Sequence, residues 1–186
     1  MNFFPKLEFS LLNGWIFLVT FFLIFAITLK TCSKEVISRL YDDKGWTKKQ
    51  YIFTKLAKLM GLVHSFLVIF TPINIISLDF LIGAIIYIFG TIGMTVALIN
   101  FKKAPLNNPI SSGLYKISRN PQLVMIYLVS LGNSFIISSW TAVIIVVISM
   151  IFSHFRILGE ERRLFEQYGD LYLKYKKKVP RYFLLI

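Results

Sequence analysis

Four long stretches of the chain contain no Asp, Glu, Lys or Arg, and this feature limits the possible folds more than any other. The stretches cover residues 9–29, 59–78, 80–101 and 120–155. About 20 consecutive apolar residues cross a bilayer as an α-helix. Only 16% of the residues are charged, whereas an ordinary soluble domain has about 25%. The sequence therefore predicts an all-α, polytopic membrane protein.

The first three stretches each predict one membrane span. Pro72 favours a turn between the second and third stretches, and Asp79, which separates them, is a candidate cap for the third span. The fourth stretch is too long for one span and short for two. Near its middle lie Gly132, Asn133 and Ser134, which are typical of a turn and favour a hairpin.

The basic residues distinguish between these alternatives. Lys and Arg collect on the cytoplasmic side of short membrane loops. Eight lie in residues 30–58, four in 102–119 and eight in 156–181, and only Lys6 lies elsewhere. Five spans, with the last two forming a hairpin, place 20 of the 21 basic residues on one face, whereas four spans divide them. We therefore expect five spans, an external N-terminus and a cytoplasmic C-terminus.

This topology also explains the net charge of +12. The basic residues lie where membrane topology places them, and they can also attract anionic lipid. Nucleic-acid binding is therefore not expected. A metal site is not expected either, because the chain has one cysteine, Cys32, and two distant histidines, His64 and His154. His64 is interpreted as a neutral residue that packs between helices, while His154 lies near the cytoplasmic end of the last span.

Arg119 lies at the cytoplasmic mouth of the predicted hairpin. Asn120 is a candidate N-cap, and Pro121 suits the first turn of a helix. A basic residue at a helix start opposes the helix dipole. Either an anionic partner or a role in fixing the topology explains Arg119, and the residues alone leave both open.

The chain after Arg156 predicts an amphipathic cytoplasmic helix on the membrane surface. Its apolar stripe has a possible break at Gly169 and consists of Leu164, Phe165, Tyr168, Leu171, Tyr172 and Tyr175. Arg156 precedes Glu160 by four residues, so a helical ion pair is expected. Carboxylates so close to hydrocarbon need partners, and either Glu160 or Glu161 could instead face a ligand.

The order and spacing of these residues resemble the isoprenylcysteine carboxyl methyltransferase family, and the phospholipid N-methyltransferases are similar. The resemblance covers roughly residues 105–182 and rests on Gly113-x-Tyr115-x-x-x-Arg119-Asn120-Pro121, on Arg156-x-x-x-Glu160-Glu161, and on Phe165-x-x-Tyr168-Gly169-x-x-Tyr172-x-x-Tyr175-x-x-x-Val179-Pro180-Arg181. Asn120 stands where the family usually has His. Because an amide does not titrate, a general base at that position is excluded.

The resemblance implies an integral membrane enzyme that uses S-adenosylmethionine, with a three-span region over residues 1–100 and a catalytic region over 101–186. A carboxylate suits the positive groups of this cofactor and an arginine suits its carboxylate. We therefore expect catalytic roles for Arg119, Glu160 and Glu161. Cofactor contacts are expected from Tyr115, Asn120, Pro121, Leu123, His154, Arg156, Glu160, Glu161, Tyr168 and Tyr172.

The acceptor implied by the resemblance is a membrane lipid or a lipidated molecule that enters from the bilayer. Isoprenylcysteine carboxylate, phosphatidylethanolamine, a small thiol and other lipids all fit. The expected location is the cell membrane of a prokaryote or the endoplasmic reticulum of a eukaryote, with the active site facing the cytoplasm. Two alternatives are an NADPH-dependent membrane reductase of the sterol-reductase type and a non-catalytic scaffold that binds lipid.

Overall fold

The computed structural model describes residues 1–43, 45–105 and 108–183, and these residues form helices without any strand. The predicted all-α fold is therefore confirmed. The elements in chain order are α1 (Trp15–Lys30), α2 (Lys34–Leu40), α3 (Lys48–Phe70), α4 (Leu78–Lys103), the 3₁₀ helix η1 (Gly113–Lys116), α5 (Pro121–Ile136), α6 (Trp140–Tyr168) and α7 (Asp170–Lys178).

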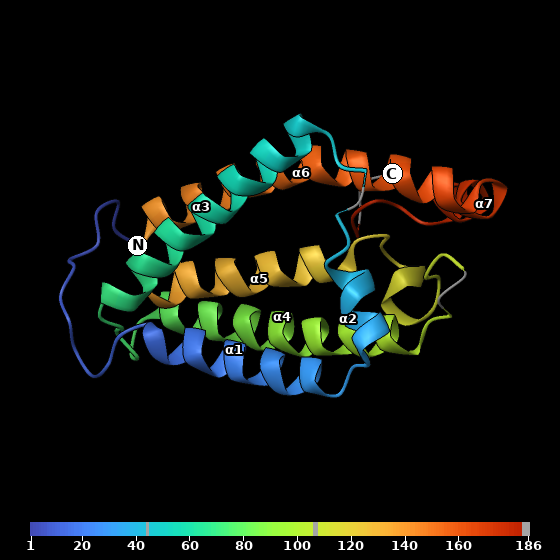
Figure 1. Ribbon diagram of the computed structural model, residues 1–186. Coiled ribbons are helices and arrows are strands. Elements are labelled where there is room, and N and C mark those ends of the chain that lie inside the picture. The colour runs from blue at the N-terminus through green and yellow to red at the C-terminus, as the bar shows by residue number, and fades with distance from the viewer. Residues whose placement is uncertain (44, 106–107, 184–186) are drawn as a thin grey trace.

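Five of these helices are apolar, which agrees with the prediction of about five spans and a polytopic membrane protein. By length and composition, α3, α4 and α6 can each cross a membrane. The other two, α1 and α5, have 16 residues each and measure about 24 Å, less than the roughly 30 Å of hydrocarbon in a bilayer. The five apolar helices alternate in direction along the chain (Figure 1).

The apolar helices form two layers (Figure 1). One layer holds α3 and α6, and the other holds α1, α4 and α5. The layers meet at one end of the bundle, where His64 Nε2 of α3 lies 3.0 Å from Ser134 Oγ of α5. This buried contact agrees with the interpretation of His64 as a packing residue. The layers separate toward the other end, here called the basic end, where Lys30, Lys48 and Lys103 lie and where α2 connects α1 with α3.

Small residues bring α4 and α5 into close contact. A Cβ atom on Gly83 would lie 2.5 Å from the backbone nitrogen of Ile136, and one on Gly132 would lie 2.6 Å from the backbone nitrogen of Tyr87. Helices in membranes commonly approach one another through such residues. This contact anchors α5, whose first turn carries part of the predicted site.

The hairpin turn does not lie at Gly132, Asn133 and Ser134, and that part of the prediction is wrong. These three residues are buried within α5 because the close contact with α4 requires a small residue there. The chain turns at 137–139, where Ser138 has a positive φ of 49°. Ser139 then caps α6 by accepting a hydrogen bond from the Ala142 nitrogen at 3.2 Å.

Two predicted caps also differ from the structure. Ser77 caps α4, whereas Asp79 lies in its first turn, 2.9 Å from the N-terminal amino group. Asn120 occupies the N-cap position of α5 without capping it, since its side chain donates to the Arg181 carbonyl oxygen at 3.2 Å. The predicted break at Gly169 is confirmed, because its φ of 52° separates α6 from α7.

Candidate active site

A cavity of about 1000 Å³ lies between the two layers at the basic end of the bundle. All seven α-helices and η1 contribute residues to its wall. One part of the wall consists of charged and polar side chains at the basic end. The rest reaches into the membrane-spanning part of the bundle, where Phe25, Gly61 and Met94 line it.

Most of the predicted site residues meet around this cavity. Its wall includes Tyr115, Arg119, Asn120, Leu123, Arg156, Glu160, Glu161, Tyr168 and Tyr172. Two predicted residues are not part of the wall. Pro121 is buried at the first position of α5, and His154 Nδ1 lies 3.1 Å from the hydroxyl oxygen of Tyr182.

Glu161 is the anionic partner of Arg119. Arg119 Nη2 lies 3.0 Å from Glu161 Oε1, and both side chains are almost fully buried, with 7% and 5% exposure. Arg181 binds the same carboxylate through two hydrogen bonds of 2.9 Å, and Lys176 Nζ lies 3.8 Å away. The cation at the start of α5 is therefore balanced by the C-terminal part of α6.

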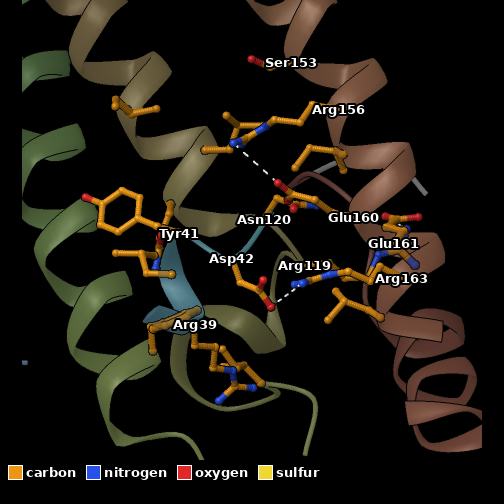
Figure 2. Close-up of a pocket in the computed structure, with 18 of the residues that line it drawn as sticks. Arg39, Tyr41, Asp42, Arg119, Asn120, Ser153, Arg156, Glu160, Glu161 and Arg163 are labelled. Atoms are coloured by element: carbon orange, nitrogen blue, oxygen red, sulfur yellow. Dashed lines mark hydrogen bonds and ion pairs between the residues drawn. The ribbon is translucent and has the colours of Figure 1, made fainter. Parts of the chain in front are cut away.

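Glu160 has a simpler environment, on the side of α6 that faces the cavity. Its Oε1 lies 3.6 Å from Arg156 Nη1, so the predicted ion pair between positions four apart is present. Figure 2 shows both side chains between α5 and α6, with Glu160 reaching toward Arg156. The adjacent carboxylates of Glu160 and Glu161 thus have different partners.

The two carboxylates also differ in their pKa. Both lie beyond the charge-free part of α6, which ends at Phe155. Burial raises the pKa of Glu160, and the positive charges of Arg156 and Arg163 oppose this only in part. Burial would also raise the pKa of Glu161, but the hydrogen bonds from Arg181 and the nearby cations outweigh it and lower that pKa. Glu161 is therefore a fixed charge, whereas Glu160 is the more readily protonated carboxylate.

Several buried polar atoms in the wall have no hydrogen-bond partner among the described residues. They are Thr54 Oγ1, Arg119 Nε, Gln122 Nε2, Arg156 Nε, Arg163 Nε and the hydroxyl oxygen of Tyr172. Burial raises the pKa of Tyr172, so its hydroxyl stays protonated and can donate. Unpaired buried donors are costly and uncommon in folded proteins. Their convergence on one cavity indicates a ligand with several acceptor groups.

Comparison with known proteins agrees with this geometry. A family model described as phospholipid methyltransferase matches residues 69–171, which is more than half of the chain. The chain belongs to the phospholipid methyltransferase family. The matched segment runs from the end of α3 into α7 and contains Arg119, Glu160 and Glu161. No curated protein and no solved structure matches the chain.

Family membership confirms the resemblance identified from the sequence, and the apolar helices agree with a membrane methyltransferase.

The phospholipid methyltransferase match begins after α2 and most of α3, yet both helices help to enclose the cavity. No site residue was predicted within residues 30–58. The structure instead places seven residues of this segment, from Lys34 to Asp42, in the wall.

Two contacts hold α2 and the residues directly after it in place at the basic end. Asp42 Oδ2 lies 2.5 Å from Arg163 Nη1 on α6, and Figure 2 shows Asp42 reaching toward that helix. Arg39 donates to the carbonyl oxygens of Pro105 and Asn108, both at 2.9 Å. The signal for this helix was present in the sequence as Ser33, which caps α2.

Sequence reasoning also missed Gln122, Arg163 and Arg181 as site residues. Gln122 follows the recognised Arg119-Asn120-Pro121 motif directly, and as the second residue of α5 it lines the cavity. Arg181 ends the Val179-Pro180-Arg181 motif. Its contact with Glu161 depends on the path of the chain after α7, which the spacing of residues does not predict.

Proposed function

We propose that this protein is an integral membrane methyltransferase that uses S-adenosylmethionine and methylates a lipophilic acceptor. Because basic residues collect on the cytoplasmic side of membranes, the basic end is proposed to face the cytoplasm. One observation carries the proposal. Glu160, Arg156 and unpaired buried donors surround a single cavity in a chain of the phospholipid methyltransferase family.

The residues of the wall fit the charges of this cofactor. Glu160 would bind its positively charged amino or sulfonium group. Arg156, whose Nε has no partner among the described residues, would bind its carboxylate. Gln122 Nε2 and the Tyr172 hydroxyl would donate to its remaining polar atoms, and Leu123 would pack against the adenine. When bound, the cofactor supplies an electrophilic methyl group.

Glu161 is proposed to act as a positioning residue. It holds Arg119 in place through a buried ion pair, while Arg181 ties the segment after α7 to the same carboxylate. Arg119 would then orient an anionic acceptor or cofactor group with its unpaired Nε. Orientation of this kind, together with exclusion of water by α2, can supply a large part of the acceleration of a methyl transfer.

Binding of the product S-adenosylhomocysteine tests the proposal directly. Calorimetry with the purified protein in detergent is expected to show binding of S-adenosylhomocysteine and none of NADPH. The reverse result would instead support a membrane reductase. Binding of neither would support a non-catalytic scaffold. A screen for methyl transfer from labelled S-adenosylmethionine across lipid classes would then identify the acceptor.

A further inference from the structure

The cavity wall contains a basic residue, Lys58, that has no role in the proposed cofactor site. Lys58 lies on α3, twelve residues before the helix ends at Phe70, or about 18 Å along the axis. It shares one face of the helix with Thr54, Ala57 and Gly61, and all four line the cavity. Lys58 is exposed and directly precedes the charge-free stretch of residues 59–78, so its ammonium group lies where the cavity enters the membrane-spanning part of the bundle.

Lys58 forms no ion pair within residues 1–43, 45–105 and 108–183. The acidic residues of the same cavity have other positions or partners. Asp42 and Glu160 each pair with an arginine of α6, and Glu161 binds three basic residues. Glu35 lies in the exposed first turn of α2. The ammonium group therefore has no counter-ion among the described residues that line the cavity.

Thr54 lies one helical turn before Lys58 and is a second donor without an acceptor. Its side chain is buried, with 9% exposure, and Oγ1 has no hydrogen-bond partner among the described residues. Three other helical threonines donate to the carbonyl oxygen four residues earlier, whereas Thr91 Oγ1 of α4, like Thr54 Oγ1, has no hydrogen-bond partner among the described residues. Thr20 and Thr28 donate at 2.8 Å and Thr95 at 3.0 Å. The free hydroxyl of Thr54 therefore needs another partner.

The hydroxyl groups on the facing wall are already satisfied. The Tyr127 hydroxyl oxygen lies 2.6 Å from Ser153 Oγ and 2.9 Å from the Ser149 carbonyl oxygen. Ser149 Oγ donates to the Ala57 carbonyl oxygen at 3.2 Å. This part of the cavity thus leaves one cation and one hydroxyl donor, four residues apart on one helix face. Such a pair matches an oxyanion, which accepts charge-assisted hydrogen bonds.

We propose that Lys58 and Thr54 bind an oxyanion, either phosphate or carboxylate, of the lipophilic acceptor and so determine which acceptors are methylated. This inference rests on the proposed function, because it assigns the acceptor to the same cavity. Both residues precede the matched segment 69–171. Acceptor specificity therefore resides in the N-terminal helices, while cofactor binding resides in the matched segment and the C-terminal part.

Binding of defined lipids by the purified full chain in maltoside detergent tests the inference. The probes are radiolabelled dioleoyl phosphatidic acid, oleate and dioleoylglycerol, which lacks an oxyanion. We expect selective retention of the first two. Lys58→Met and Thr54→Val should each weaken their retention at least fivefold, whereas Lys58→Arg should retain most of it.

Lys55→Met is the matched control, because Lys55 lies on the same helix but not in the cavity wall. It should change retention less than twofold. An equal loss in this control, or unchanged retention in Lys58→Met, would overturn the inference. Inorganic phosphate at millimolar concentration is expected not to displace phosphatidic acid. Displacement would overturn the assignment to a lipid.

Two further measurements separate this inference from the proposed function. Thermal unfolding should show that the variants remain folded, and calorimetry should show that Lys58→Met binds S-adenosylhomocysteine like the original protein. Selective lipid retention without binding of S-adenosylhomocysteine would contradict the proposed function alone. Cofactor binding without any oxyanion selectivity would contradict this inference alone.

Discussion

Glu160 and Glu161 are adjacent in the sequence and line the same cavity, yet their carboxylates contact different groups of cations. Glu160 pairs with Arg156 of its own helix, whereas Glu161 binds Arg119, Arg181 and Lys176 from three other segments. The first carboxylate is available to a ligand. The second holds the start of α5 and the end of the chain together, so the two should respond differently to substitution.

Glu161→Gln is expected to destabilise the protein. It removes the negative charge that balances Arg119, and that arginine is 7% exposed. Breaking a buried ion pair by removing one partner costs about 3–5 kcal/mol. Thermal unfolding in detergent should show a clear fall in Tm. Glu166→Gln, on the exposed surface of the same helix, is the control and should leave Tm unchanged. An unchanged Tm in both would mean that the pair contributes nothing.

Glu160→Gln is expected to weaken binding of S-adenosylmethionine at least tenfold, with Tm close to that of the original protein. The amide keeps the shape of the side chain and loses the charge that would attract the cationic groups. Isothermal titration calorimetry measures this loss. Binding as tight as that of Glu166→Gln would exclude Glu160 from the cofactor site.

The affinity for S-adenosylmethionine should also depend on pH. Burial raises the pKa of Glu160 above its ordinary value of 4.5. Above that raised pKa the carboxylate is ionised and attracts a cation. Affinity should therefore fall as the pH decreases through it, at a higher pH than an exposed glutamate would produce. Titrations across this range should show no such fall in Glu160→Gln, and a parallel fall in both proteins would assign the effect to another group.

Gly132→Ala is expected to destabilise the contact between α4 and α5. The new Cβ would lie 2.6 Å from the Tyr87 backbone nitrogen, and backbone cannot move aside cheaply. Overpacking of this kind costs about 1–3 kcal/mol. Gly61→Ala is the matched control, because a Cβ there meets nothing within 4 Å. Thermal unfolding of both variants should show a loss of stability for Gly132→Ala alone.

Reversal of the charge at Asp42 should weaken the attachment of α2 to α6 at the cavity. Asp42→Arg places two guanidinium groups face to face, since Asp42 contacts Arg163 at 2.5 Å. S-adenosylhomocysteine should then dissociate several times faster in stopped-flow measurements. Adding Arg163→Asp to the same protein should restore slow release. If the double variant remains fast, this ion pair does not hold α2 in place.

The sequence predicted the helical membrane fold because long charge-free segments have few alternatives in a bilayer. It also predicted the Arg156–Glu160 pair, which depends only on helical spacing. It misplaced the hairpin turn because Gly132 serves equally well in a turn and in a tight helix contact. Only the three-dimensional arrangement distinguishes these uses.

The candidate site was predictable where one helix or one motif carries it. Arg119, Glu160 and Glu161 were identified in this way, and they meet at one cavity. The pairing of Glu161 with Arg181, and the position of α2 across the cavity, depend on how connecting segments cross the bundle. The path of a connecting segment is not encoded in a repeating pattern of apolar residues, so the sequence does not predict it.

The unbroken helix α6 has a consequence for the environment of the protein. It runs for 29 residues from Trp140 to Tyr168 and carries Arg156 and Glu160 beyond its apolar part. Helices adjust to hydrophobic mismatch by tilting, and the lipids around them determine how far. A tilt of α6 would move both charges at once, so the thickness of the surrounding bilayer would affect the geometry of the cavity.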